Sequence, residues 1–234
     1  MGAIIRRELS AYFTSPVGFV YIGAVYFLSG IFLLTGSLMA GSADIRPVFS
    51  SLFSVVMFLT PVLTMRLMSE DRRRKTDQLL LTSPVALGAI VAGKFLSAAV
   101  VYIAAISVTL LYAAVLSFFA SITWAVIFGN YIALLLAGLA FISIGQFISS
   151  LTESQAAAAT GTFAAVLGIL FLDVLPSIIT NPVLSSFIQE LSFTRRFTPI
   201  TSGILSVSNL FYFFSICAVF LFLTTRVLEK RRWS

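Results

Sequence analysis

The 234-residue sequence has no histidine and only one cysteine, Cys217. Without histidine a Ser-His-Asp triad cannot form, and zinc, haem and iron–sulfur sites lose most of their ligands. A single cysteine cannot make a disulfide within the chain. We therefore expect no catalytic, cofactor-binding or metal-binding residues here, and we do not expect the chain to be an enzyme.

Charged residues are also scarce, at 10% of the sequence, whereas a soluble domain has about 25%. They gather in patches, and the stretches between the patches can cross a hydrocarbon core about 30 Å thick, which takes roughly 20 helical residues. Because lipid leaves backbone groups no other partners, these stretches must be helices. The sequence therefore predicts an all-α integral membrane protein, residues 1–234 forming one domain, with six transmembrane helices at Pro16–Leu38, Val48–Leu67, Leu87–Phe118, Trp124–Leu151, Ala156–Leu175 and Leu210–Leu228.

The lysines and arginines indicate the orientation of these spans, because cytoplasmic loops carry an excess of both. With both termini in the cytoplasm, the inner side holds Arg6, Arg7, Arg66, Arg72, Arg73, Arg74, Lys75, Lys94, Arg226, Lys230, Arg231 and Arg232. The outer side then holds only Arg46, Arg195 and Arg196. The high pI therefore reflects topology and attraction to lipid headgroups, and we expect no nucleic-acid partner.

Residues 1–15 form an amphipathic leader before the first span. Apolar residues recur at helical spacing and charged residues fall on other faces: Ile4, Ile5, Leu9 and Phe13 against Arg6, Arg7 and Glu8. This pattern predicts a helix lying in the headgroup plane. The alternative is an ordinary leader that only sets the topology. Pro16 then suits the first turn of the first span.

The segment 69–84 is the one charge-dense stretch. Its charged part contains Glu70, Asp71, Arg72, Arg73, Arg74, Lys75, Thr76 and Asp77, and its apolar turn, Leu79, Leu80 and Leu81, precedes Pro84. We expect a short cytoplasmic helix. It could lie on anionic lipid or dock on a protein partner. The acidic residues favour the protein partner, because lipid anchoring gains nothing from them.

The segment 176–209 is too polar to span the membrane and too apolar for a free loop. Asn181 and Pro182 are typical of a helix start, and an apolar face follows in the next ten residues. A second short helix is predicted from Pro199 to Val207. We expect two short re-entrant helices dipping into the outer interface, which is allowed where protein buries the backbone.

The stretch from Gly88 to Phe95 imitates a phosphate-binding loop. It matches the GxxxxGK pattern, but Phe95 stands where a magnesium-ligating Ser or Thr is required, and no strand precedes it. We expect Lys94 to extend to the cytoplasmic interface. Any ATP site must then lie on another chain.

Two isolated acidic residues and a set of small residues remain. Asp173 lies near the outer end of the fifth span, close to the break at Pro176. It could lie within the membrane, where an acid would indicate transport, or at the interface. Glu153 lies in the inner turn between spans four and five, either solvated or in contact with a partner. Small residues at four-residue spacing predict close helix packing, within the chain or between protomers: Gly145 and Ser149, Ala157 and Gly161, Gly161 and Ala165.

Several motifs along nearly the whole length resemble one family. They are Arg7-Glu8-Leu9 through Ser15-Pro16-Val17-Gly18, Pro61 to Arg66 with Ser69 to Arg72, Leu79 to Pro84 with Gly93-Lys94-Phe95, Ser149 to Gln155, and Arg231-Arg232-Trp233. In order and spacing they resemble permease subunits of ABC-2 type transporters, most closely the gliding-motility-associated (GldF-like) permeases.

The resemblance implies a function for each segment. The leader with Arg6, Arg7 and Glu8 would be an interfacial elbow helix, and segment 69–84 would be a coupling helix that docks on an ATP-hydrolysing subunit. Glu70 and Asp71 match the acidic pair of the family, and Thr76 matches the threonine of its Gly-Thr element. The glycine of that element is Lys75 here, and the glutamate that follows it is Gln78. These departures affect the fine coupling contacts.

The expected protein is thus a non-catalytic permease in a bacterial cell membrane, and an exporter. ATP and magnesium would be bound by the ATPase partner, a second permease chain would complete the pathway as a homo- or heterodimer, and an accessory membrane subunit could join. We expect the hydroxyl face of span two, Ser50, Ser54, Thr60 and Thr64, to line the pathway, unless these hydroxyls bond to their own helix. The alternatives are a stand-alone carrier or channel, and a membrane scaffold that recruits a cytoplasmic protein.

Overall fold

The computed structural model describes residues 2–39, 41, 44–76, 85–119, 123–179, 182–201 and 206–232, and every element within these ranges is helical. Six helical stretches are long and apolar enough to cross a membrane: Pro16–Leu38, Arg46–Arg73, Leu87–Ser117, Trp124–Leu151, Gln155–Ser177 and Val207–Arg232. The prediction of an all-helical membrane protein with six candidate spans is therefore confirmed.

The elements that build these spans follow the chain order. They are α2 (Pro16–Leu33) with the π-helical turn η1 (Leu34–Leu38), α3 (Arg46–Thr64), α4 (Ser69–Arg73), α6 (Leu87–Ile106), α7 (Val108–Ser117), α8 (Trp124–Leu151), α9 (Gln155–Val174) with the 3₁₀ turn η2 (Leu175–Ser177), and α12 (Val207–Arg232). The remaining helices are α1 (Gly2–Thr14), α10 (Pro182–Leu191) and α11 (Phe193–Thr201). Pro16 occupies the first turn of α2, as predicted.

The spans divide into an inner and an outer set. Half or more of the residues in the most apolar part of α3, α6 and α8 are buried, against about a fifth in α2, α9 and α12. The outer helices therefore carry exposed aromatic and aliphatic side chains, such as Phe27, Phe171 and Phe222. Such surfaces are stable only against lipid or another apolar chain.

Small residues allow the helices to approach closely within the chain. A Cβ atom on Gly138 of α8 would lie 2.1 Å from the ring of Tyr102, and one on Gly161 of α9 would lie 2.9 Å from Ile148 of α8. The close packing predicted from Gly145 and Gly161 is therefore found between helices of the same chain.

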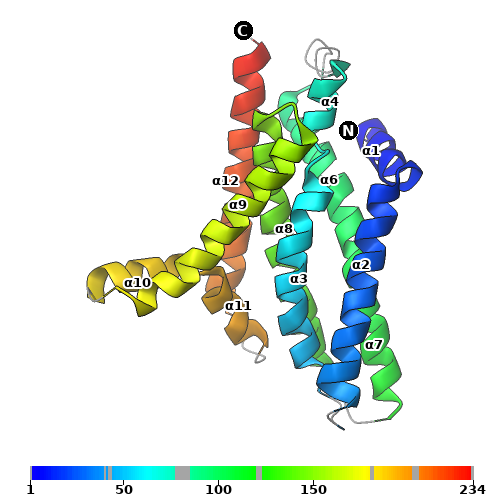
Figure 1. Ribbon diagram of the computed structural model, residues 1–234, viewed down its shortest axis with the longest axis vertical. Coiled ribbons are helices and arrows are strands. Elements are labelled where there is room, and N and C mark those ends of the chain that lie inside the picture. Colours follow the sequence, from blue (N-terminus) through cyan, green and yellow to red (C-terminus); the bar gives the residue numbers. More distant parts are fainter. Residues whose placement is uncertain are drawn as a thin grey trace.

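Both described chain ends lie at one end of the bundle, beside α4, and α10 stands out from its side (Figure 1). At the opposite end α11 packs onto the bundle through Phe193, Phe197 and Ile200, which are buried. The Phe197 ring stacks on Phe53 of α3 with 4.3 Å between ring centroids. This contact fixes α11 to the inner helices.

The predicted helix from Pro199 to Val207 is wrong in its boundaries. The second short helix runs from Phe193 to Thr201 and contains Pro199 in its interior, while residues 202–205 lie outside the described residues. The hydroxyl of Ser192 accepts a hydrogen bond from the Arg195 backbone N–H at 3.0 Å, as an N-cap does. The helix therefore starts at a serine cap, before the proline. The first short helix does begin at Pro182, and Asn181 lies outside the described residues.

Candidate functional site

Helix α1 is fixed to the end of the bundle by apolar and polar contacts. A Cβ atom on Gly93 of α6 would lie 3.1 Å from Ile4, so this glycine lets α1 lie directly on α6. The buried Tyr12 donates a hydrogen bond from its hydroxyl to the Leu63 carbonyl at 2.7 Å. This side chain, which sequence reasoning missed, ties α1 to the end of α3.

Helix α4 follows α3 after a turn at residues 65–68 and rests on α8. The Ser149 hydroxyl accepts hydrogen bonds from the backbone N–H groups of Met68 and Ser69, both at 3.1 Å. These two donors would otherwise be unsatisfied at the start of a helix. Glu70 and Asp71 lie in the first turn and arginines in the last, the arrangement that the helix dipole favours.

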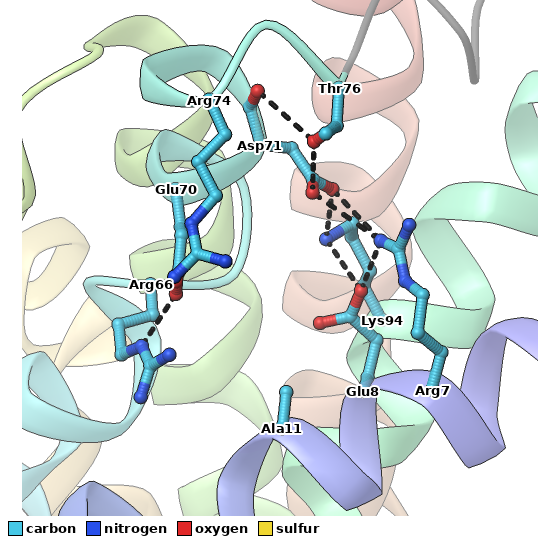
Figure 2. Close-up of a pocket in the computed structure, with 9 residues that line it drawn as sticks. All are labelled: Arg7, Glu8, Ala11, Arg66, Glu70, Asp71, Arg74, Thr76 and Lys94. Atoms are coloured by element: carbon cyan, nitrogen blue, oxygen red, sulfur yellow. Dashed lines mark hydrogen bonds and ion pairs between the residues drawn. The ribbon is translucent and has the colours of Figure 1, made fainter. Parts of the chain in front are cut away.

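Lys94 of α6 is buried beneath α1 and α4, with 2% of its side chain exposed. Its ammonium nitrogen Nζ lies 2.6 Å from Asp71 Oδ2 and 3.0 Å from Glu8 Oε1 (Figure 2). It also donates to the Leu67 carbonyl at 2.6 Å. An ammonium group has three donors, and these three acceptors use all of them. The expectation that Lys94 extends to the interface is therefore wrong, because α1 and α4 close over it and supply the acceptors that water would have supplied.

Arg7 and Thr76 complete this group, which we call the Lys94 cluster: Arg7, Glu8, Asp71, Thr76 and Lys94. The Arg7 guanidinium lies 2.6 Å from Glu8 and 3.2 Å from Asp71, and Thr76 donates to Asp71 at 2.8 Å. Partial burial alone would lower the pKa of the Arg7 guanidinium, but the hydrogen bonds and charges of Glu8 and Asp71 outweigh burial and raise this pKa. All five residues line a cavity of about 200 Å³.

Glu70 forms a second, adjoining set of ion pairs in the same cavity. Its carboxylate lies 2.6 Å from the guanidinium of Arg66 and 2.6 Å from that of Arg74. Arg66 also donates to the Ser15 hydroxyl, which lies at the junction of α1 and α2. The cavity thus contains four cations against three carboxylates, and every one of the three carboxylates is already paired.

The other side of α4 faces the turn between α8 and α9. Arg72 lies 2.8 Å from Glu153 and donates to the Leu151 carbonyl at 3.1 Å. The two charged side chains are 22% and 67% exposed, so this ion pair is much more open to solvent than the Lys94 cluster. Arg73 and Glu153 line a groove of about 460 Å³ with the first residues of α9.

The structure places the other predicted residues as follows. Arg6 is exposed and lies outside the Lys94 cluster, and Leu79 and Leu80 lie outside the described residues. Asp173 is at the opposite end of α9 from Glu153. One of its oxygens accepts from Thr194 at 2.5 Å, and the other is buried and has no partner within the described part of the chain. Glu153 is 67% exposed and pairs with Arg72 of α4, a contact that the sequence did not predict. Lys94, Arg66 and Tyr12 are further members of the site that sequence reasoning missed.

The four hydroxyls predicted to share a face of span two do not lie together. Ser50 and Ser54 are exposed, and Ser54 lines a groove of about 440 Å³ between α2 and α3. Thr60 and Thr64 are fully buried and donate to the carbonyls one turn earlier, Val56 at 2.6 Å and Thr60 at 3.0 Å. The alternative of bonding to their own helix therefore describes these two threonines, and only the two serines remain accessible.

Within the described residues, no three His, Cys, Asp or Glu side chains gather in a way that could hold a metal ion. In a comparison with known families, the model of a family described as ABC-2 family transporter protein matches residues 11–233. No curated protein matches the sequence. The family match covers all six candidate spans and α4, and it begins just after Arg7 and Glu8.

Proposed function

The chain belongs to the ABC-2 transporter family, and on this premise we propose that it is the permease subunit of an ATP-driven exporter, most similar to gliding-motility-associated permeases. Two permease chains, identical or different, form the substrate pathway in the cell membrane. A separate ATP-hydrolysing subunit binds ATP and magnesium, because this chain offers no phosphate-binding loop. Both termini and α4 face the cytoplasm, in agreement with the twelve lysines and arginines at that side.

The observation that carries this proposal is the position of α4 and the residues after it. Arg73, Arg74 and Lys75 are exposed at the end of the bundle, while the same short segment is bonded to α1, α6 and the α8–α9 turn. A partner that contacts the exposed side can therefore move several spans at once. In this proposal segment 69–84 is the coupling helix, α1 is the interfacial elbow and the α8–α9 turn with Glu153 is a second contact.

The exposed serines of α3 suggest where the pathway lies. Ser50 and Ser54 are hydroxyls on a face that would otherwise meet lipid, and a second permease chain placed there would shield them. Asp173, with one buried oxygen free of protein partners in the described residues, is a second polar group of the outer half. The re-entrant helices α10 and α11 would close that half of the pathway.

The test is a mild-detergent purification of the tagged chain from native membranes, with ATP hydrolysis measured on the eluate. We expect a co-purifying subunit that contains a phosphate-binding loop, and turnover that vanadate inhibits. A pure chain that carries no ATPase at native expression would overturn the proposal. Transport by the pure chain in proteoliposomes would then favour a stand-alone carrier.

A variant tests the coupling assignment directly. Reversing the charge of Arg72, Arg73 and Arg74 to glutamate should abolish partner-dependent ATP turnover without affecting membrane insertion. Lys230→Glu is the matched control, because Lys230 is an exposed cation at the same end of the bundle. Turnover that survives the triple reversal would contradict a coupling function of α4.

A further inference from the structure

The two sides of α4 are held by ion pairs of very different burial. Toward α1 and α6, the buried Lys94 contacts Asp71, Glu8 and the Leu67 carbonyl, which belong to α4, α1 and the turn after α3. Toward the α8–α9 turn, Arg72 pairs with Glu153, whose carboxylate is 67% exposed, and donates to the Leu151 carbonyl at 3.1 Å. The two contacts are made by neighbouring residues of one five-residue helix, Asp71 and Arg72.

Separating the buried side would be costly. Removing one partner of a buried ion pair leaves an uncompensated charge, and the Lys94 side chain is only 2% exposed. The apolar contact of Ile4 with Gly93 and the Tyr12 hydrogen bond to Leu63 add to this attachment. Helices α1 and α4 should therefore stay together on α6 whenever α4 is pushed.

Separating the exposed side costs little. Solvent-exposed ion pairs contribute only a small amount to stability, because water replaces each partner. Arg72 and Glu153 can both be solvated when they part, and the neighbouring groove between Arg73 and the start of α9 leaves space beside them. The Ser149 hydroxyl of α8 accepts hydrogen bonds from the backbone N–H groups of Met68 and Ser69. We take this contact as the point on α8 about which α4 would rotate.

We propose that Lys94 is a positioning residue that joins α1, α4 and the first turns of α6 into one rigid unit, and that this unit moves against the α8–α9 turn by breaking the ion pair of Arg72 with Glu153. This inference rests on the proposed function and adds to it the direction of the movement. The Lys94 cluster stays intact while the unit moves, and the ion pair of Arg72 with Glu153 breaks.

The experiment measures two distances in the complex with its ATPase partner. Cys217 is the only cysteine, so a Cys217→Ala background accepts pairs of spin labels. One pair joins Ser10 of α1 to Lys75, the second residue after α4, and the other joins Lys75 to Ala157 of α9. All three positions are exposed. Distances are compared between the nucleotide-free and the vanadate-trapped complex, after ATP turnover of each labelled complex has been confirmed.

We expect the Ser10–Lys75 distance to stay the same and the Lys75–Ala157 distance to change on trapping. Equal changes in both distances, or no change in either while turnover is retained, would overturn the inference and leave the proposed function intact. A complex without any ATP turnover, before labelling as well as after it, would overturn the proposed function and this inference with it.

Variants of Lys94 test its part in the rigid unit. In Lys94→Met the Ser10–Lys75 distance should become variable on trapping, and the vanadate-sensitive ATP turnover of the complex should fall about tenfold, within the usual range of coupling between sites. Lys94→Arg should restore much of the coupling, and Lys230→Met, the same exchange at an exposed position, should change neither readout. If Lys94→Met does not fold, Asp71→Asn and Glu8→Gln remove one charged partner each, and an unchanged distance in both variants would contradict the proposal.

Discussion

A Cβ atom on Gly145 of α8 would lie 2.3 Å from Oγ1 of Thr64 at the end of α3. Thr64 cannot easily turn away, because its hydroxyl donates to the Thr60 carbonyl at 3.0 Å and its side chain is fully buried. The two inner helices therefore touch at a point where only a hydrogen atom fits. Thr64 is the last residue of α3 and directly precedes the turn that leads into α4, so this contact also fixes where α4 begins.

Gly145→Ala should destabilise the protein by about 1–3 kcal/mol, the usual cost of overpacking a well-packed core. Gly168→Ala is the matched control, because a Cβ atom there meets nothing within 4 Å. The unfolding temperature in detergent, followed by size-exclusion chromatography of a fluorescent fusion, measures both variants. Equal unfolding temperatures for the two would show that α3 and α8 can separate without cost.

Lys94→Met should lower the free energy of unfolding by about 3–5 kcal/mol, because it removes one partner of a buried ion pair and leaves two carboxylates close together. Lys230→Met removes an exposed ammonium at the same end of the bundle and should be close to neutral. The same thermal assay compares the two. A Lys94 variant as stable as the control would mean that water reaches the Lys94 cluster freely.

Lys75 adopts a left-handed backbone conformation with φ of 56°, which glycine accepts without strain. Lys75→Gly should therefore be more stable than Lys75→Ala by about 1 kcal/mol, although both lose the same charged side chain. Comparing these two variants isolates the backbone, because only alanine keeps the Cβ atom. The opposite order of unfolding temperatures would argue against this conformation. The family resemblance places a glycine at this position, and the backbone conformation gives the physical reason.

Phe197→Ala should detach α11 from the bundle. The ring is buried and stacks on Phe53, so its removal should cost about 3–5 kcal/mol. Phe171→Ala, an equal truncation of a ring on the exposed side of α9, should cost much less in detergent. Limited proteolysis between α11 and α12 would report the detachment, and equal cleavage of the two variants would contradict it.

The spans could be predicted from the sequence because hydropathy and length directly reflect the lipid environment. The predicted first and fourth spans have the observed boundaries, Pro16–Leu38 and Trp124–Leu151. The contacts of Lys94 could not be predicted in this way, since its partners Glu8 and Asp71 belong to distant segments and no local pattern links them. One signal was available: Lys94 is the only charge in a long apolar stretch, and two acidic segments belong to the same side.

The four hydroxyls of span two do not share one face, contrary to the prediction from the sequence, for a geometrical reason. Ser50 and Ser54 are four residues apart and share a face, but the step of six residues to Thr60 turns a helix by about 240° beyond a full turn. Thr60 and Thr64 therefore point into the core, where they bond to their own helix. The predicted boundaries of α11 are wrong because a proline often starts a helix, as Pro199 would, whereas here Ser192 lies earlier and caps the helix.

The unequal burial of the inner and outer helices predicts how freely each position accepts substitution. In α3, α6 and α8 half or more of the positions face protein, so even exchanges between apolar residues should be selected against. In α2, α9 and α12 about four positions in five are not fully buried, and the surrounding lipid accepts any apolar side chain at the exposed ones. A saturation mutagenesis scan should therefore show intolerant positions over about half of α3, α6 and α8, and only a narrow intolerant stripe along α2, α9 and α12.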